Sequence, residues 1–233
     1  MIKIEGLTKC YGNKNAVENL SLQVNAGELF GFIGPNGAGK TTTLKAISGI
    51  LDFDGGDIFI MGCSIKTDPI KAKRNIAYIP DNPDIYSYMK GIDYLNFIAD
   101  IYGTDMEKRG ELIGDYAAQF EILDVLNMPI GGYSHGMKQK LAIISALIHS
   151  PKVLILDEPF VGLDPKASHT LKQLMRKLCD EGGCIFFSTH VLEVAQSICD
   201  KIAIIKQGKL VVQGDTHSVC SEKSLEEIFM ELV

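Results

Sequence analysis

Hydrophobic and polar positions alternate with a period of two at the start of the chain. Ile2 and Ile4 alternate with Lys3 and Glu5, and a second extended run covers residues 16–24 after the turn-prone Gly12-Asn13. This pattern is typical of half-buried antiparallel strands. Residues 57–61 resume as a strand after a glycine pair. The first 61 residues therefore predict an antiparallel β-lobe.

Fully apolar runs follow a different pattern. Residues 29–33, 153–156 and 184–187 are continuous hydrophobic segments, which is the pattern of strands buried on both faces of a parallel sheet. A short strand is expected at residues 75–79 and a hairpin at 201–213. Residues 224–227 have the pattern of a capping box, which predicts a last short helix. Ligands of parallel sheets bind at the carboxyl ends of the strands, so the polar residues that follow these runs are candidate site residues.

The segment from residue 83 to residue 150 shows helical periodicity and no convincing strand. It is too long for one crossover between parallel strands, so it predicts an inserted helical lobe. Near the end of this segment, Ser134 stands where the N-cap of a helix belongs. The expected fold class is α/β, with a mostly parallel core sheet, an antiparallel β-lobe and this insertion. We expect a single domain over 1–233, with the β-lobe and core at 1–82 and 151–233 and the helical lobe at 83–150.

Composition narrows the possible functions. The chain has 233 residues, 46% of them hydrophobic, and a formal net charge of −6, which weighs against non-specific nucleic-acid binding. No apolar run approaches the ~18 residues of a membrane span, so a membrane role is expected to be peripheral. Six scattered cysteines without a C-x-x-C pair indicate reduced, buried thiols in a cytosolic protein, rather than a metal or disulfide framework.

Residues 34–42 carry the strongest chemical signal. They fit the spacing G-x-x-x-x-G-K-[ST] between an apolar strand and a helix, which predicts a phosphate-binding loop. The glycines let backbone N–H groups surround phosphate oxygens, Lys40 reaches the β- and γ-phosphates, and the Thr41 hydroxyl is placed to bind Mg²⁺. The candidate nucleotide-binding residues here are Gly34, Pro35, Asn36, Gly37, Ala38, Gly39, Lys40, Thr41 and Thr42.

Three further residues follow the buried strands. Asp157 is positioned for Mg²⁺, Glu158 for polarising an attacking water, and His190 for contacting a γ-phosphate. The adjacent carboxylates could otherwise start a turn, and a single histidine at a strand end is usually structural. Tyr11 is expected on a loop between the first two strands, and it leaves two alternatives open: its ring stacks on a purine, or it packs half-buried against the sheet.

The order and spacing of these segments resemble the ATP-binding subunit of ABC transporters over essentially the whole chain. Residues 34–42 match its Walker A motif, 153–158 its Walker B motif and 133–137 its signature loop. By this resemblance Ser134, Gly136 and Met137 contact nucleotide, and the set is completed by the D-loop residue Asp164, the switch histidine His190, the adenine-stacking Tyr11 and the adjacent Ala16.

Two departures favour one branch of the family. The usual L-S-G-G-Q signature reads Tyr-Ser-His-Gly-Met here, and Asp81 stands where the family has a glutamine. Both changes look like the branch that serves type-2 exporters, including antibiotic and peptide efflux systems. Asp81 can bind Mg²⁺ directly or through water, since its carboxylate carries charge.

The resemblance implies a phosphate-loop, RecA-like core that binds ATP and Mg²⁺ and hydrolyses ATP. It implies a head-to-tail dimer with a second copy or a homologous subunit, a separate transmembrane permease, and a place on the cytoplasmic face of the membrane. No nucleic-acid partner is expected. The alternatives are a soluble ABC-type ATPase acting on DNA or the ribosome, whose coiled coil or second cassette is missing here, and a small-molecule kinase, which does not explain the signature loop.

Overall fold

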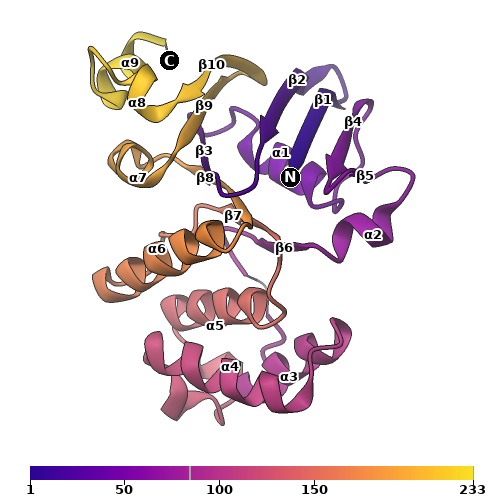
Figure 1. The fold of residues 1–233 in the computed structure, drawn as a ribbon, viewed down its shortest axis with the longest axis vertical. Helices are drawn as coiled ribbons and strands as arrows, with labels where there is room; N and C mark the ends of the chain where they lie inside the picture. The colour runs from indigo at the N-terminus through magenta and orange to yellow at the C-terminus, as the bar shows by residue number, and fades with distance from the viewer. Residues whose placement is uncertain (84, 233) are drawn as a thin grey trace. The chain divides into compact units, whose positions relative to one another are not determined.

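The computed structural model describes residues 1–83 and 85–232 (Figure 1). Its strands are β1 (Ile2–Tyr11), β2 (Lys14–Val24), β3 (Leu29–Ile33), β4 (Gly55–Ile60), β5 (Cys63–Ser64), β6 (Ile76–Ile79), β7 (Val153–Asp157), β8 (Cys184–Thr189), β9 (Lys201–Lys206) and β10 (Lys209–Asp215). Its helices are α1 (Lys40–Ile47), α2 (Pro69–Lys73), α3 (Gly91–Ile101), α4 (Met106–Gln119), η1 (Leu123–Val125), η2 (Ile130–Gly132), α5 (His135–Leu147), α6 (Pro165–Asp180), α7 (Leu192–Ile198), α8 (Thr216–Val219) and α9 (Leu225–Leu232).

The chain forms two compact units. The sheet unit consists of residues 1–78, 152–158 and 175–233, and the helical unit consists of residues 79–151 and 159–174. The chain therefore passes between the units four times, and two of these crossings fall within β6 and α6. The prediction placed a helical lobe at 83–150 only. The expectation of a single domain over residues 1–233, with the lobes bounded as given above, stays a prediction.

The sheet unit contains both predicted kinds of sheet. The first sheet has the order β2-β1-β4-β5, and its pairs are antiparallel. The second has the order β10-β9-β3-β8-β7-β6, in which β3 pairs in parallel with β8 and β9, and β7 pairs in parallel with β8. This confirms the predicted α/β class. It also brings the carboxyl ends of β3, β7 and β8 to one edge.

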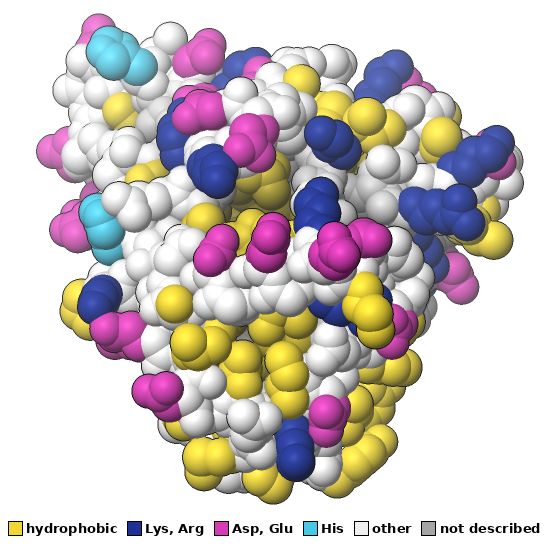
Figure 2. Space-filling view, turned by 60° about the horizontal axis from the view of Figure 1, so that its bottom comes forward, with side chains coloured by type: hydrophobic (Ala, Val, Ile, Leu, Met, Phe, Trp, Pro, Cys, Tyr) yellow, Lys and Arg dark blue, Asp and Glu magenta, His cyan; other side chains and the backbone are white. Residues whose placement is uncertain are grey.

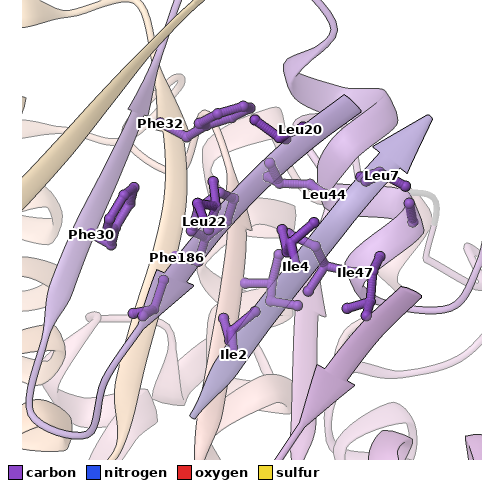
Figure 3. Close-up of a cluster of buried hydrophobic side chains, with 14 of the residues drawn as sticks. Ile2, Ile4, Leu7, Leu20, Leu22, Phe30, Phe32, Leu44, Ile47 and Phe186 are labelled. Carbon is purple, nitrogen blue, oxygen red and sulfur yellow. The ribbon is translucent and has the colours of Figure 1, made fainter. Parts of the chain in front are cut away.

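A buried hydrophobic cluster joins the two sheets and α1 (Figure 3). Ile2 and Ile4 supply the inward positions of the alternating first strand, as the sequence pattern predicts. Phe30 and Phe32 of β3 lie with ring centroids 5.5 and 5.2 Å from that of Phe186 on β8. Burying such aromatic side chains contributes a large share of the stability of a core. The cluster fixes β3 and β8 side by side beneath the loop that follows β3.

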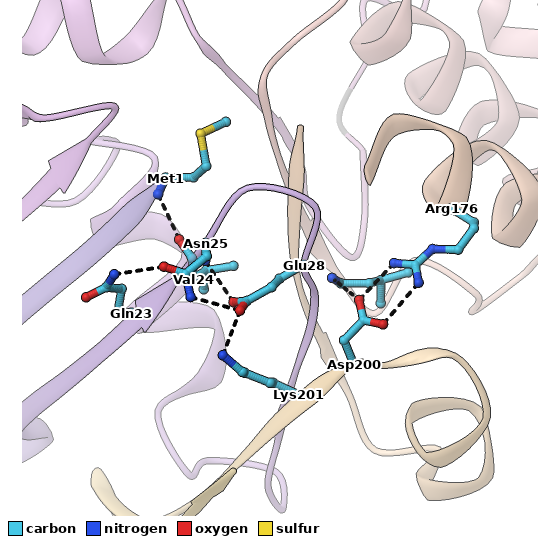
Figure 4. A network of polar contacts seen from close by, with 9 residues as sticks. Met1, Gln23, Val24, Asn25, Glu28, Arg176, Asp200 and Lys201 are labelled. Atoms are coloured by element: carbon cyan, nitrogen blue, oxygen red, sulfur yellow. Dashed lines mark hydrogen bonds and ion pairs between the residues drawn. The ribbon is translucent and has the colours of Figure 1, made fainter. Parts of the chain in front are cut away.

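A polar network holds the opposite, amino-terminal end of β3 (Figure 4). Asp200 accepts a hydrogen bond from the Leu29 backbone N–H at 2.8 Å and a two-point contact from Arg176 at 2.8 and 3.0 Å. Lys201 reaches Glu28 at 2.6 Å. Planar two-point Arg–carboxylate pairs add geometric specificity to their energy. The network therefore sets the register of β3 against β9.

The helical unit has its own core. Leu95 of α3, Ile113 of α4 and Leu141 of α5 are buried, in agreement with the predicted amphipathic helices. The Tyr133 hydroxyl donates to the Val125 carbonyl at 2.7 Å, so η1 is tied to the start of α5. Between β6 and β7 the described residues form no strand. An isolated bridge between Lys90 and Pro129 is the β-pairing recorded there.

Some local predictions need correction. Tyr11 is the last residue of β1 rather than part of a loop, because β1 and β2 pair as far as Tyr11 and Lys14. All six cysteines are free, but Cys10, Cys63 and Cys220 are only half-buried, since they lie near turns and chain surfaces rather than in the apolar core. The hairpin of β9 and β10 is confirmed.

The capping box at residues 224–227 is also confirmed. The Ser224 hydroxyl accepts from the Glu227 backbone N–H at 3.2 Å, and the Glu227 carboxylate accepts from the Ser224 backbone N–H at 2.8 Å. These reciprocal bonds satisfy two N–H groups at the start of α9.

Within residues 1–83 and 85–232, no helix is both long enough and apolar enough to span a membrane.

Candidate functional site

The loop between β3 and α1 has the geometry of an anion cradle. Gly39, the N-cap of α1, has φ of 109°, and a Cβ there would lie 2.4 Å from the Ala16 carbonyl oxygen. Gly37 has φ of 78° and open space around its missing Cβ. Glycine adopts these angles without the strain of other residues. No side chain caps the first turn of α1, so its N–H groups and helix dipole are available to an anion.

Lys40 is held inside this loop. Its side chain is 7% exposed, and its ammonium donates to the Gly34 carbonyl at 2.6 Å. The same Nζ lies 3.7 Å from Glu158 Oε1. A buried ammonium at the carboxyl end of β3 thus stands beside a carboxylate at the end of β7. This places the predicted phosphate-binding cation and the predicted general base in one site.

Ser188 connects the ends of β7 and β8. Its hydroxyl donates to Asp157 Oδ1 at 2.5 Å, and both residues are buried. The two residues are paired in the strand register, 31 positions apart in the sequence. Sequence reasoning missed Ser188 as a site residue. The available signal was a hydroxyl at the end of a fully apolar strand, next to His190.

Glu158 has a left-handed backbone conformation with φ of 49°. A non-glycine residue in this region costs of order 1 kcal/mol or more and needs local support. Its N–H donates to the Ser188 carbonyl at 3.2 Å and lies 3.1 Å from the Ser188 hydroxyl. Its Oε2 lies 3.0 Å from His190 Nδ1 and 3.3 Å from the His190 N–H. The carboxylate is therefore oriented from two sides.

The predicted signature residues lie in the helical unit. Ser134 is the N-cap of α5, as predicted, and its hydroxyl accepts from the Met137 N–H at 3.3 Å. A Cβ at Gly136 would lie 2.6 Å from the Gly162 carbonyl. Gly136 therefore has a packing role against the 162–164 turn, beyond the nucleotide contact that the resemblance implies. The His135 ring lies against the same turn, at Gly162.

Lys140 holds the predicted D-loop residue. Its Nζ lies 2.7 Å from Asp164 Oδ2, while Asp164 Oδ1 accepts from the Ala167 N–H at 2.8 Å. The bond from Lys140, followed by the one from Ala167, holds the pKa of Asp164 below its usual value. Sequence reasoning did not select Lys140, because the pair spans 24 positions and lies on two separate segments.

The structure divides the predicted residues between the two units. The sheet unit brings together the 34–42 loop, Ala16, Asp157, Glu158 and His190. Tyr11 is 54% exposed at the end of β1, with the Lys9 ammonium 5.4 Å from its ring centroid. The helical unit holds Asp81, Ser134, Gly136, Met137 and Asp164.

Comparison with known proteins decides the family. The model of the family described as ABC transporter matches residues 17–161. The uncharacterised ABC transporter ATP-binding protein YxlF of Bacillus subtilis (strain 168) is 40% identical over 219 residues, which is 94% of this chain and 72% of that protein. The linearmycin resistance ATP-binding protein LnrL of the same strain is 34% identical and covers 95% of this chain and 71% of its own length. The chain belongs to the ABC transporter ATP-binding proteins.

Solved structures agree with this ABC assignment. A structure described as an ATP-binding subunit of an ABC transporter has a TM-score of 0.95 and 32% identity, and covers 100% of this chain and 99% of its own. A dimeric ATP-binding cassette in a post-hydrolysis state, bound to ADP and Pi, has a TM-score of 0.85 and 24% identity, with 93% and 99% covered, and shares the fold. The chain is thus an ATP-binding subunit of the ABC transporter family, and the resemblance read from the sequence is confirmed.

Proposed function

We propose that this ABC subunit hydrolyses ATP with Mg²⁺ at the carboxyl ends of β3, β7 and β8, and thereby drives export through a separate permease. The observation that carries the proposal is the joint placement of Lys40, Asp157 and Glu158 beside a glycine cradle. A buried cation, a buried carboxylate and a second, oriented carboxylate are the groups that phosphoryl transfer to water requires.

The residues present fit a nucleotide with Mg²⁺. The open space at Gly37 and the uncapped first turn of α1 suit phosphate oxygens. The Thr41 hydroxyl and Asp157 carboxylate are oxygen donors of the kind that Mg²⁺ prefers. The assignment of Asp81 to Mg²⁺ stays a prediction of the family resemblance. When bound, Mg²⁺ supplies neutralisation of developing phosphate charge.

Each protein group has a distinct role in this proposal. Lys40 binds phosphate as a point charge, and Glu158 accepts a proton from water as general base. His190 orients Glu158, since its Nδ1 and N–H both face the Oε2 atom. Ser188 positions Asp157 through its hydroxyl and Glu158 through its carbonyl. The left-handed backbone at Glu158 aims the carboxylate and is stabilised by these bonds.

Glu158→Gln tests the catalytic assignment. Loss of a general base should lower the ATP turnover rate by ~10²- to 10⁴-fold, while ATP affinity stays within a few-fold, because the 34–42 loop is unchanged. Glu181→Gln, at the exposed residue that follows α6, is the matched control and should keep the parental rate. Parental turnover in Glu158→Gln would reject Glu158 as the base.

We also infer two partners. The signature residues and the nucleotide loop suit a head-to-tail dimer that shares ATP, and a solved neighbour of the same fold is dimeric. A transmembrane permease would place the subunit on the cytoplasmic face of a membrane. The name of LnrL, a linearmycin resistance protein, and that of a Nod factor export protein from Burkholderia orbicola (strain AU 1054) support export as the direction.

The helical unit presents a surface suited to a permease. Tyr86 lies with its ring centroid 5.9 Å from that of Tyr88, 6.5 Å from that of Tyr94 and 6.2 Å from that of Phe97. Tyr88 is 80% exposed. Figure 2 shows hydrophobic side chains gathered on the lower part of the view, over the helical unit. Exposed apolar clusters of this kind mark protein interaction sites. We call Tyr86, Tyr88, Tyr94 and Phe97 the aromatic surface.

Co-purification tests the permease proposal. The subunit, expressed with the membrane protein encoded beside it, should bring that protein through affinity purification in detergent. Tyr88→Ala should weaken recovery, because Tyr88 is the most exposed ring of the aromatic surface, whereas Met106→Ala, 79% exposed elsewhere on the unit, should not. Equal recovery with both variants would remove the aromatic surface from the interface.

A further inference from the structure

The sheet unit carries a positively charged surface on and around α2. Within residues 66–74, four side chains are basic (Lys66, Lys71, Lys73 and Arg74) and one is acidic (Asp68), and all five are exposed. The whole chain has a formal net charge of −6. We call the four basic residues with Ile70 the basic face. In Figure 2 dark blue side chains gather at the right of the view, over the part of the chain that includes α2.

The charge of the basic face is only partly neutralised within the protein. Lys71 lies 3.5 Å from Asp68, on the exposed surface. Lys66 donates to the Gly56 carbonyl at 2.8 Å and lies 4.4 Å from the Phe53 ring centroid, contacts that leave its charge unpaired. In the described part of the chain, Lys73 and Arg74 have no ion pair. The basic face therefore has a positive electrostatic potential that attracts anions.

An apolar group stands among these charges. Ile70 is 70% exposed on α2, while Ala72 of the same helix is fully buried and anchors it to the sheet unit. Beside the helix a surface pocket of about 400 Å³ is lined by Phe53, Lys66 and Lys73, together with Asp52. Cations around an exposed aliphatic side chain match an anionic bilayer surface, where phosphates meet the acyl boundary.

We propose that the basic face binds the anionic phospholipid surface of the membrane, with lipid phosphates against Lys66 and Lys73 and with Ile70 at the interface. This inference rests on the proposed function, because a permease would hold the subunit beside a bilayer. It adds a direct lipid contact in the sheet unit, separate from the aromatic surface of the helical unit.

Vesicle flotation of the purified subunit, without permease, tests the proposal. The protein should float with vesicles that contain phosphatidylglycerol and not with vesicles of phosphatidylcholine alone, and added salt should release it. Each cation should raise the partition coefficient about five-fold, equivalent to ~1 kcal/mol. The variant with Lys71→Gln, Lys73→Gln and Arg74→Gln should therefore bind on the order of 100-fold more weakly.

Matched controls separate a specific face from general charge. The variant with Lys108→Gln, Lys177→Gln and Lys209→Gln removes the same charge from exposed positions elsewhere and should retain binding. Ile70→Ser should lower the part of binding that salt does not remove, with little effect on stability, because the side chain is already exposed. ATP turnover in solution should be parental in all three variants.

Several outcomes would overturn the inference. One is binding that does not depend on anionic lipid. Another is equal loss in the control triple variant. A third is that neither the parent protein nor any variant floats with anionic vesicles. If the basic-face variant then also loses permease co-purification, the face binds an acidic permease loop instead of lipid. Failure of the proposed function would instead appear as parental turnover in Glu158→Gln, which leaves flotation unaffected.

Discussion

At the scale of single residues, Ser188 contacts two of the predicted site residues, although its place in the sequence did not single it out. Its hydroxyl donates to Asp157 at 2.5 Å and faces the Glu158 N–H at 3.1 Å, and the site where these bonds form is buried. Hydrogen bonds to charged, buried groups are worth more than those at the surface. The hydroxyl therefore positions Asp157 and Glu158 together, the carboxylates proposed to bind metal and to activate water.

Ser188→Ala should lower the free energy of unfolding by about 1 to 3 kcal/mol, because Asp157 loses its buried donor. It should also lower the ATP turnover rate while nucleotide affinity is largely kept. Ser145→Ala is the matched control, since Ser145 is buried but its hydroxyl donates to a backbone carbonyl, that of Ala142. Denaturant unfolding and steady-state kinetics provide the readouts, and equal turnover in both variants would contradict the positioning role.

Tyr11 allows an equally sharp test, because it is 54% exposed. If its ring stacks on the adenine, Tyr11→Ala should weaken ATP binding by ~1 to 3 kcal/mol, the range for base–aromatic stacking, and Tyr11→Phe should restore it. The exposed ring predicts little change in stability. Calorimetric titration with ATP measures the effect. If the alanine variant binds ATP with unchanged affinity, the ring does not stack on the adenine and Tyr11 has only a packing role.

At the scale of elements, α5 and the turn before α6 behave as one piece of the helical unit. Gly136 approaches the Gly162 carbonyl closely, and Lys140 binds Asp164 at 2.7 Å. Asp164 in turn caps the first turn of α6 through the Ala167 N–H. The signature helix and the D-loop are therefore linked inside a single unit.

Lys140→Met should raise the pKa of Asp164 toward its ordinary value, because the bond from Lys140 is the largest cause of the lowered pKa. The pKa of Asp164 is lower in the folded than in the unfolded protein. The pair with Lys140 therefore stabilises the fold fully at pH values above the unfolded pKa, and this stabilisation is lost as the pH falls through the folded pKa. The stability difference between parent and variant should therefore shrink on acidification. Carboxyl-carbon NMR titration measures the pKa.

The control for this experiment is Lys138→Met. Lys138 lies on the same helix, and the described residues give it no ion pair. Its variant should leave the Asp164 titration unchanged. An equal pKa change in both variants would mean that general charge, rather than the Lys140 contact, governs Asp164.

The elements also show what sequence can and cannot provide. The strands around residues 29–33, 153–157 and 184–189, the nucleotide loop and the N-cap at Ser134 follow from local pattern, so they were predictable. The strand order that sets β8 between β3 and β7 depends on contacts between distant segments. Ser188 and Lys140 acquire their roles only through that packing. The sequence therefore selected Asp157, Glu158, Asp164 and His190 as candidates, but not Ser188 and Lys140, which contact Asp157 and Asp164 across distant segments.

At the scale of the whole molecule, the proposed dimer is the widest prediction. Glu158→Gln with ATP should run as a dimer in light scattering at high protein concentration and as a monomer with ADP, because charge-assisted contacts to the γ-phosphate contribute ~1.5 to 3 kcal/mol each. Adding Ser134→Arg should abolish the ATP-dependent dimer by placing a bulky side chain at the N-cap of α5.

The control for the dimer experiment is Ser221→Arg, at an exposed position of the sheet unit between α8 and α9, which should leave the ATP-dependent dimer intact. A Glu158→Gln variant that is inactive yet monomeric with ATP would contradict a shared site in the isolated subunit. Loss of the dimer in both arginine variants would point to a general effect of charge.

The four chain crossings between the units have a mechanical consequence. Two of them bracket β7, at residues 151–152 and 158–159, so the strand is joined to the helical unit by a peptide bond at each end of its segment. Glu158 is the last residue before the second of these crossings, and its backbone is already in a left-handed conformation. A movement of the helical unit that is taken up at this crossing changes backbone torsion angles next to the proposed general base. One peptide bond thus joins the helical unit to the residue whose carboxylate is proposed to activate water.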